Sequence, residues 1–248
     1  MDIFLAIIGL GLLILGAEIV IRGSVSFGKK LNISLFAIGV VIVAGGTSLP
    51  ELASCINAVL NNHSDLALGA VVGSNIANLI LVMAATTTIY PIVKINKNQI
   101  NQAWINIFLG IVLIFMTFFY FNYIFGIVAI LTLIYLMYIQ IKKGELDNAE
   151  IDKNDYSMII SLILIMLGVI FLVFGSDLLV NSAIKIAKKY NVSQTVIGLS
   201  LIAFSTSLPE LVVGILSAIK RKVDFALGNI LGSNIYNVLG VLGISSFF

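Results

Sequence analysis

Long apolar runs separated by short polar stretches dominate the chain. Because about 20 apolar residues suffice to cross a bilayer as a helix, these runs predict membrane-spanning helices. We place them near residues 3–21, 34–60, 65–88, 102–120, 123–141, 157–180, 192–219 and 223–247. The only sizeable polar stretch between them lies at 142–156. The pattern therefore predicts an all-α integral membrane protein with about eight transmembrane helices.

The composition excludes a soluble protein. Hydrophobic residues make up 60% of the chain and charged residues 10%, and the mean hydropathy is +1.12. A soluble domain carries roughly 25% charged residues. So few charged side chains cannot cover a water-facing surface, which excludes a soluble enzyme and a nucleic-acid binder. The expected surroundings are the lipid bilayer.

The distribution of basic residues predicts the orientation of the chain. The loops after odd-numbered spans hold eleven of the fourteen lysines and arginines, and the loop between the sixth and seventh spans holds Lys185, Lys188 and Lys189. Since cytoplasmic loops carry the excess of positive charge, the side with eleven is predicted to be cytoplasmic. The N-terminus is then expected to lie outside.

The chain contains an internal repeat. Residues 45–52 (GGTSLPEL) match residues 204–211 (FSTSLPEL), and residues 67–80 (ALGAVVGSNIANLI) match residues 226–239 (ALGNILGSNIYNVL), both at an offset of 159 positions. Five spans precede the second copy, so the copies enter the membrane in opposite senses. Inverted repeats of this kind build many secondary transporters. We expect a first repeat at 1–141, a cytoplasmic linker at 142–156, and a second, inverted repeat at 157–248.

Each repeat carries an acid in the middle of an apolar span, Glu51 in the first and Glu210 in the second. An ionised acid at the bilayer centre costs at least ~2.5–3.5 kcal/mol, and these spans contain no lysine or arginine to offset it. Pro50 and Pro209 each precede an acid and remove a helical hydrogen bond, which frees carbonyl oxygens. Such groups are tolerated in a membrane only where they line a cavity or a water-filled path. The arrangement predicts a buried cation between the two carboxylates.

Other oxygen-bearing side chains recur around the two acids. Hydroxyl groups precede each proline, and Ser–Asn pairs four residues apart share a helix face in each repeat. Carboxylate, hydroxyl and amide oxygens are ligands that suit Ca²⁺ and Na⁺. No histidine accompanies the acids, which disfavours a transition metal. The contributing hydroxyl and amide residues are Thr47, Ser48, Thr206, Ser207, Ser74, Asn78, Ser233 and Asn237.

Asn75 and Asn234 lie on a different helix face from these Ser–Asn pairs. They are candidates either for the ion site or for hydrogen bonds between helices, a common use of polar residues in membranes.

The blocks GTSLPE and GSNIxN, duplicated in inverted halves, resemble those of the sodium/calcium exchangers of the cation/calcium antiporter superfamily, in particular its compact prokaryotic members. The resemblance implies an antiporter rather than an enzyme, with no cofactor, in a prokaryotic cell membrane. It implies that Glu51 and Glu210 are shared ligands of Ca²⁺ and Na⁺, and that the first and sixth spans move during alternating access. The further ligands that it implies fall on Ala44, Thr47, Ser48, Ala203, Thr206, Ser207, Ser74, Ser233, Asn78 and Asn237.

The sequence departs from the family pattern at three places. Ser205 stands where the family has glycine, and its side chain either crowds the unwound turn or adds a ligand. Asn237 stands where several relatives carry aspartate, which implies exchange that does not require K⁺. The family has ten spans and this chain is expected to have eight; the alternatives are a truncated chain, or a homo-oligomer in which a second copy covers the exposed face.

Two other functions remain open from the sequence. A Ca²⁺/H⁺ exchanger of the same superfamily would neutralise the two glutamates with protons. A passive cation channel, or a membrane protein that binds Ca²⁺ without transporting it, would follow if helices needed for alternating access were absent.

Overall fold

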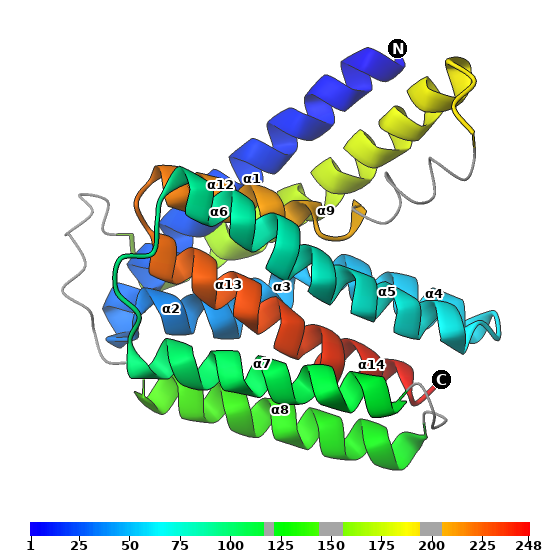
Figure 1. Ribbon diagram of the computed structural model, residues 1–248. Coiled ribbons are helices and arrows are strands. Elements are labelled where there is room, and N and C mark those ends of the chain that lie inside the picture. The colour runs from blue at the N-terminus through cyan, green and yellow to red at the C-terminus, as the bar shows by residue number, and fades with distance from the viewer. Residues whose placement is uncertain (117–121, 144–155, 194–204) are drawn as a thin grey trace.

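The computed structural model of the chain describes residues 1–116, 122–143, 156–193 and 205–248, and the regular structure in these ranges is helical. Figure 1 shows the arrangement of the elements. In chain order they are α1 (Asp2–Leu31), α2 (Leu35–Ile38), the π-helical η1 (Gly39–Val43), α3 (Ala44–Thr47), α4 (Leu49–Leu60), α5 (Ser64–Ala77), the π-helical η2 (Asn78–Val82), α6 (Met83–Ile89), α7 (Lys97–Met116), α8 (Tyr123–Lys143), α9 (Met158–Lys189), α12 (Leu208–Ile219), α13 (Val223–Ile235), the π-helical η4 (Tyr236–Val241) and α14 (Leu242–Ser245).

The helices confirm the predicted all-α membrane architecture. Among the described residues, six helices are long and apolar enough to cross a membrane, or up to seven if the bent pair Leu35–Thr47 and Leu49–Leu60 counts as one span. Of the span predicted at 192–219, the structure describes residues 192–193 and 205–219, and the second part contains α12. The total of eight spans and the outward N-terminus remain predictions.

The helices extend beyond the predicted ends of the first and sixth spans, so the placement of their lysines in loops was wrong. Lys29 and Lys30 lie in the last turn of α1 and Lys188 and Lys189 in the last turn of α9, not in loops. Apolarity marks where a helix leaves the hydrocarbon, whereas the helix itself continues into the interface. Lysine favours this position because its charge complements the carbonyl end of the helix dipole.

Helices α1 and α9 pack against each other in antiparallel fashion through glycines. A Cβ atom added at Gly16 would lie 2.8 Å from the carbonyl oxygen of Gly168, and one added at Gly175 would lie 2.8 Å from the carbonyl oxygen of Gly9. Small residues allow the backbones of membrane helices to approach this closely. As α1 and α9 occupy equivalent places in the two copies, their opposite directions agree with an inverted repeat (Figure 1).

The backbone itself repeats at the same offset as the sequence. Four described residues other than glycine have positive φ: Asn32 and Asn191, at 55° and 57°, and Asn62 and Arg221, at 62° and 59°. Each pair is 159 positions apart, at the end of equivalent helices. Left-handed conformations are uncommon outside glycine, so their recurrence supports the repeat independently of the matching letters.

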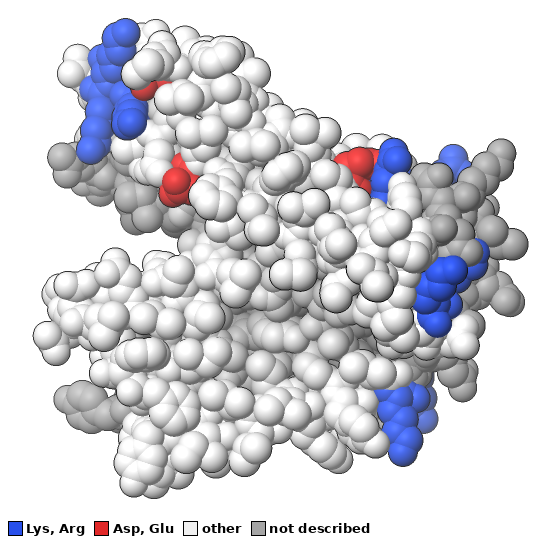
Figure 2. Space-filling model, turned by 180° about the vertical axis from the view of Figure 1, so that it is seen from behind, with Lys and Arg blue, Asp and Glu red and all other residues white. Residues whose placement is uncertain are grey.

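The span Val223–Ser245, which comprises α13, η4 and α14, is the most enclosed of the candidate spans. In its most apolar window 94% is buried inside the protein, against 22–33% for the other five spans. Helix α13 runs between α5 and α7 in Figure 1 and contacts η1, α2 and α12. Figure 2 shows lysine and arginine gathered at the two ends of the molecule, with a largely uncharged region between them. This distribution suits a bilayer around the middle of the protein.

Candidate cation site

Each predicted proline break is present in the structure. Helix α3 ends at Thr47 and α4 begins at Leu49, with Ser48 between them at φ −82° and ψ 6°. Ser207 has nearly the same conformation, φ −86° and ψ 2°, immediately before α12. Proline lies in the first turn of the new helix in both cases, where its missing N–H is not needed. The break places the following glutamate in the first turn of a helix that starts in the middle of the protein.

The carbonyl groups at these breaks are partly occupied by the chain. The Ala44 carbonyl accepts hydrogen bonds from the Ser48 N–H at 3.0 Å and from the Thr47 hydroxyl at 3.3 Å. The Ser205 carbonyl, four residues before Pro209, accepts a hydrogen bond from Ser176 of α9 at 2.9 Å. The predicted ligand Ala203 lies outside the described residues.

Glu51 and Glu210 are brought together in the interior, and both are fully buried. Each carboxyl group lies beside a threonine of the other repeat, Thr206 beside Glu51 and Thr47 beside Glu210. No described lysine or arginine is among the neighbours of either carboxyl group. Two ionised acids at this depth are unfavourable unless a cation or protons neutralise them.

Ser74 connects the first carboxyl group to the second repeat. Its hydroxyl donates to Glu51 Oε1 at 3.0 Å and lies 3.1 Å from the Ser207 hydroxyl. The Asn237 amide donates to Ser74 Oγ at 3.2 Å. Residues from α4, α5, the turn before α12 and η4 therefore form one hydrogen-bonded group, although they are far apart in the sequence.

A second hydroxyl group lies near Glu210. Thr47 Oγ1 is 3.3 Å from the hydroxyl oxygen of Ser233 and 3.3 Å from Oδ1 of Asn229. Asn229 is fully buried on α13 and was missed by the sequence analysis. Its spacing of four residues from Ser233 places it on the same helix face as that predicted ligand. The equivalent position in the first repeat is Ala70, so comparison of the two repeats does not identify Asn229.

Asparagines join the two repeats beside the acids. Asn78 donates from Nδ2 to Oδ1 of Asn234, and Asn237 donates from Nδ2 to Oδ1 of Asn75, both at 3.0 Å. Both donating residues, Asn78 and Asn237, are fully buried. The four residues occupy equivalent positions in the two copies, so this arrangement is symmetric.

Several buried oxygens in this group have no hydrogen-bond partner among the described residues. They are Ser48 Oγ, Glu51 Oε2, both carboxyl oxygens of Glu210, and Oδ1 of Asn78 and of Asn237. Buried polar atoms are nearly always satisfied, so six unsatisfied oxygens around two acids point to a bound group that accepts oxygen ligands. The described residues contain no cluster of three or more histidine, cysteine, aspartate or glutamate side chains that could hold a metal ion.

A surface cleft adjoins this site at Thr206. It has a volume of about 480 Å³ and is lined by Pro50 and Ser54 of α4, by α9 residues that include Asp177, and by Thr206. Figure 2 shows an indentation beneath the projecting ends of α1 and α9. Thr206 lines this cleft and also lies beside the buried Glu51.

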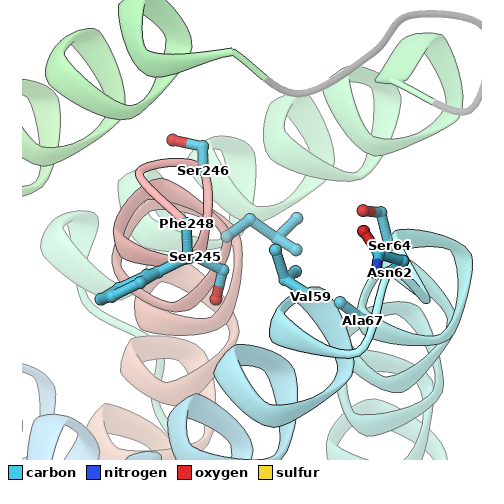
Figure 3. A pocket seen from close by; sticks show the side chains of 8 residues that line it. Val59, Asn62, Ser64, Ala67, Ser245, Ser246 and Phe248 are labelled. Atoms are coloured by element: carbon cyan, nitrogen blue, oxygen red, sulfur yellow. The ribbon is translucent and has the colours of Figure 1, made fainter.

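A smaller hollow of about 300 Å³ lies elsewhere, between the α4–α5 turn and α14. Figure 3 shows Ser245 and Phe248 on one side of it, and Val59 and Asn62 on the other. None of the predicted ligands lines this hollow.

The chain matches the family model of the sodium/calcium exchanger protein over residues 1–142 and 160–248. It is 34% identical over 243 residues to an uncharacterized membrane protein of Methanocaldococcus jannaschii, covering 98% of this chain and 80% of that protein. It is 28% identical over 294 residues to the sodium/calcium exchanger MaX1 of Methanosarcina acetivorans, covering 100% of this chain and 83% of that protein.

Solved structures of a sodium-calcium exchanger have the same fold as this chain over nearly its whole length. The sodium-calcium exchanger NCX_Mj, soaked with 2.5 mM Na⁺ and 1 mM Sr²⁺, superposes with a TM-score of 0.87 at 33% identity, covering 100% of this chain and 82% of that chain. The same exchanger soaked with 2.5 mM Na⁺ and 0.1 mM Ca²⁺ gives a TM-score of 0.86 at 33% identity, covering 99% of this chain and 81% of that one. With the duplicated motifs, the inverted fold and the paired acids in agreement, the chain belongs to the sodium/calcium exchanger family.

Proposed function

We propose that this multi-pass membrane protein is a secondary antiporter that exchanges Ca²⁺ for Na⁺ at one buried site. The observation that carries the proposal is the pair of fully buried acids, Glu51 and Glu210, with unsatisfied oxygens and no described basic neighbour. Sodium/calcium exchangers are transporters and not enzymes, and no step of exchange breaks a covalent bond. Both acids come from one chain, so the proposal does not require an oligomer.

The proposed ligands are the oxygens that the sequence motifs repeat in both halves. The carboxylates supply the charge, and hydroxyl, amide and backbone oxygens complete the coordination that Ca²⁺ and Na⁺ prefer. Ten of the twelve proposed ligand residues contribute through their side chains: Thr47, Ser48, Glu51, Ser74, Asn78, Thr206, Ser207, Glu210, Ser233 and Asn237. The backbone carbonyls of Ala44 and Ala203 are the remaining two.

Antiport follows from the charge of the site. Two ionised carboxylates without a cation are costly in the bilayer interior, so the empty protein changes conformation less readily than the loaded one. Either Ca²⁺ or Na⁺ neutralises the acids and permits the change. An ion leaving on one side is therefore replaced before the site faces the other side, which couples the two fluxes.

We further propose that the two repeats comprise residues 1–141 and 157–248, with the linker 142–156 between them, and that α1 and α9 move together during alternating access. Their glycine contacts support a common movement. Gly9 and Gly16 of α1 lie so close to α9 that an added Cβ would be within 3.0 Å of its backbone. Helices in such contact are displaced as one body.

The proposal is tested by ⁴⁵Ca²⁺ uptake into proteoliposomes loaded with Na⁺, compared with vesicles loaded with K⁺ or choline. Uptake is expected only with internal Na⁺. Uptake driven by a pH gradient with Na⁺ absent from both sides would establish Ca²⁺/H⁺ exchange instead. Entry that requires no counter-ion would establish a channel, and binding without flux would contradict transport.

Asn237→Asp is expected to make exchange depend on an added monovalent cation or on external pH. Asn237 donates to Ser74 at 3.2 Å and to Asn75 at 3.0 Å, and a carboxylate can donate to neither. It would also bring a third negative charge into a site of low dielectric constant, which requires another cation or a proton.

Flux across K⁺ and pH series checks this prediction. Wild-type exchange is expected to be unchanged when choline replaces K⁺. A K⁺ requirement in the wild type would contradict the role given to Asn237, and so would an Asn237→Asp variant with wild-type behaviour in both series.

A further inference from the structure

We propose that Asn75 and Asn234 are positioning residues that fix which way the amides of Asn237 and Asn78 face. In this arrangement each repeat presents one amide oxygen to the cation. The inference rests on the function proposed above and adds two residues that themselves need not touch the ion.

The orientation starts at two backbone carbonyls. Nδ2 of Asn75 donates to the carbonyl oxygen of Asn234 at 3.4 Å, and Nδ2 of Asn234 donates to the carbonyl oxygen of Asn75 at the same distance. The oxygen and nitrogen of an asparagine amide can be exchanged by a half-turn of the side chain, but a backbone carbonyl can only accept. Each of the two side chains must therefore present its NH₂ group to the opposite helix, which directs its own Oδ1 elsewhere.

The same logic transfers the orientation to the next pair. Oδ1 of Asn75 accepts from Nδ2 of Asn237, and Oδ1 of Asn234 accepts from Nδ2 of Asn78, both at 3.0 Å. A half-turn of Asn237 would place its oxygen against the oxygen of Asn75, so two acceptors would face each other. Asn237 and Asn78 are therefore fixed with their NH₂ groups toward the neighbouring asparagine.

What remains on the other side of each fixed amide is its oxygen. Oδ1 of Asn78 and Oδ1 of Asn237 are buried and have no hydrogen-bond partner among the described residues. An amide oxygen held in one direction is a better ligand than one that exchanges places with an NH₂ group, because an NH₂ group repels a cation. Each repeat makes the same hydrogen bonds to the other repeat, so the amides of Asn78 and Asn237 are oriented alike.

This role differs from simple attachment of two helices. Attachment would need only the two bonds from Asn75 and Asn234 to backbone carbonyls, and it would not involve Asn78 or Asn237. A positioning role predicts crosswise coupling: Asn75 acts through Asn237, and Asn234 acts through Asn78. Coupled residues show non-additive effects in a double-mutant cycle, whereas independent residues show additive ones.

The experiment measures Ca²⁺ affinity of the purified protein by isothermal titration calorimetry, together with the midpoint of thermal unfolding. Asn75→Ala is expected to weaken Ca²⁺ binding about two- to tenfold, the range of one hydrogen bond. In an Asn237→Ala background it is expected to have no further effect, because its target is gone. In the matched Asn78→Ala background its full effect is expected to persist. Asn234→Ala is expected to show the opposite pattern.

Asn75→Asp supplies a second variant that does not depend on the alanine variants folding well. Its carboxylate still accepts from Nδ2 of Asn237 and adds negative charge near the cation, although it cannot donate to the Asn234 carbonyl. Ca²⁺ binding is therefore expected to be no weaker than in the wild type. Equal effects of Asn75→Ala in both backgrounds would overturn the proposal, as would a lower unfolding midpoint with unchanged Ca²⁺ affinity. Because binding is measured without flux, crosswise coupling in a protein that shows no Na⁺-dependent uptake would refute the antiporter while leaving the positioning role intact.

Discussion

Glu51→Gln and Glu210→Gln are each expected to abolish Na⁺-dependent Ca²⁺ uptake while the protein still inserts and folds. Each carboxylate supplies half of the negative charge in the proposed site. In the loaded site each carboxylate forms a buried charge pair with the cation. Removing one partner of such a pair costs about 3–5 kcal/mol, which corresponds to at least about a hundredfold in affinity for the cation. No described basic side chain adjoins either acid, so neither substitution leaves a buried positive charge without a partner.

⁴⁵Ca²⁺ uptake and the thermal unfolding midpoint check this prediction. The matched control is Asp65→Asn, which removes an exposed carboxylate in the first turn of α5 and is expected to leave uptake near the wild-type level. Added Ca²⁺ should raise the unfolding midpoint of the wild type and of the control, because a ligand stabilises the state that binds it. Near-normal exchange by either glutamine variant would refute the two-acid site.

Gly168→Val is expected to lower both stability and transport. A Cβ atom at this position would lie 2.7 Å from the carbonyl oxygen of Gly16 and 2.8 Å from the backbone nitrogen of Val20. Backbone atoms of a packed helix cannot turn aside as a flexible side chain does, so α1 and α9 must separate. Overpacking of this kind costs about 1–3 kcal/mol, and separation also removes the contacts by which the two helices move together.

Gly11→Val is the matched control for this substitution. It introduces the same side chain into the middle of a spanning helix, but nothing lies within 4 Å of an added Cβ. Thermal unfolding and ⁴⁵Ca²⁺ flux of the two variants are compared with the wild type. Equal loss in both would show that the effect comes from the helix propensity of valine and not from the α1–α9 contact.

The parts of the site that depend on local chemistry were predictable from the sequence. Pro50 and Pro209 set the position of the helix breaks to within a residue, because the clash of proline with the preceding turn is a local effect. The repeat then placed Glu51 and Glu210 at equivalent depths in opposite halves. Their proximity in the structure follows from those two facts.

The parts that depend on how helices cross were not predictable. Periodicity put Asn75 and Asn234 on a separate face of their helices, but their partners are set by the crossing of α5 with α13. Asn229 reaches Thr47 across 182 positions of sequence, and no local pattern encodes that approach. The extension of α1 to Leu31 and of α9 to Lys189 was missed because hydropathy reports the membrane boundary and not the helix end.

The antiparallel pair α1 and α9 has two lysines in the last turn of each helix, Lys29 and Lys30 in α1 and Lys188 and Lys189 in α9. Because the two helices are antiparallel, these lysines lie at opposite ends of the pair. Any displacement of the pair along the membrane normal therefore draws one set of ammonium groups toward the hydrocarbon while the other set moves further into water. A lysine side chain can reach back to the interface only over its own length, beyond which the cost rises toward ~2.5–3.5 kcal/mol per charge. If the pair moves as proposed, the two ends therefore oppose displacement in either direction, and the reach of a lysine side chain limits how far the pair can move.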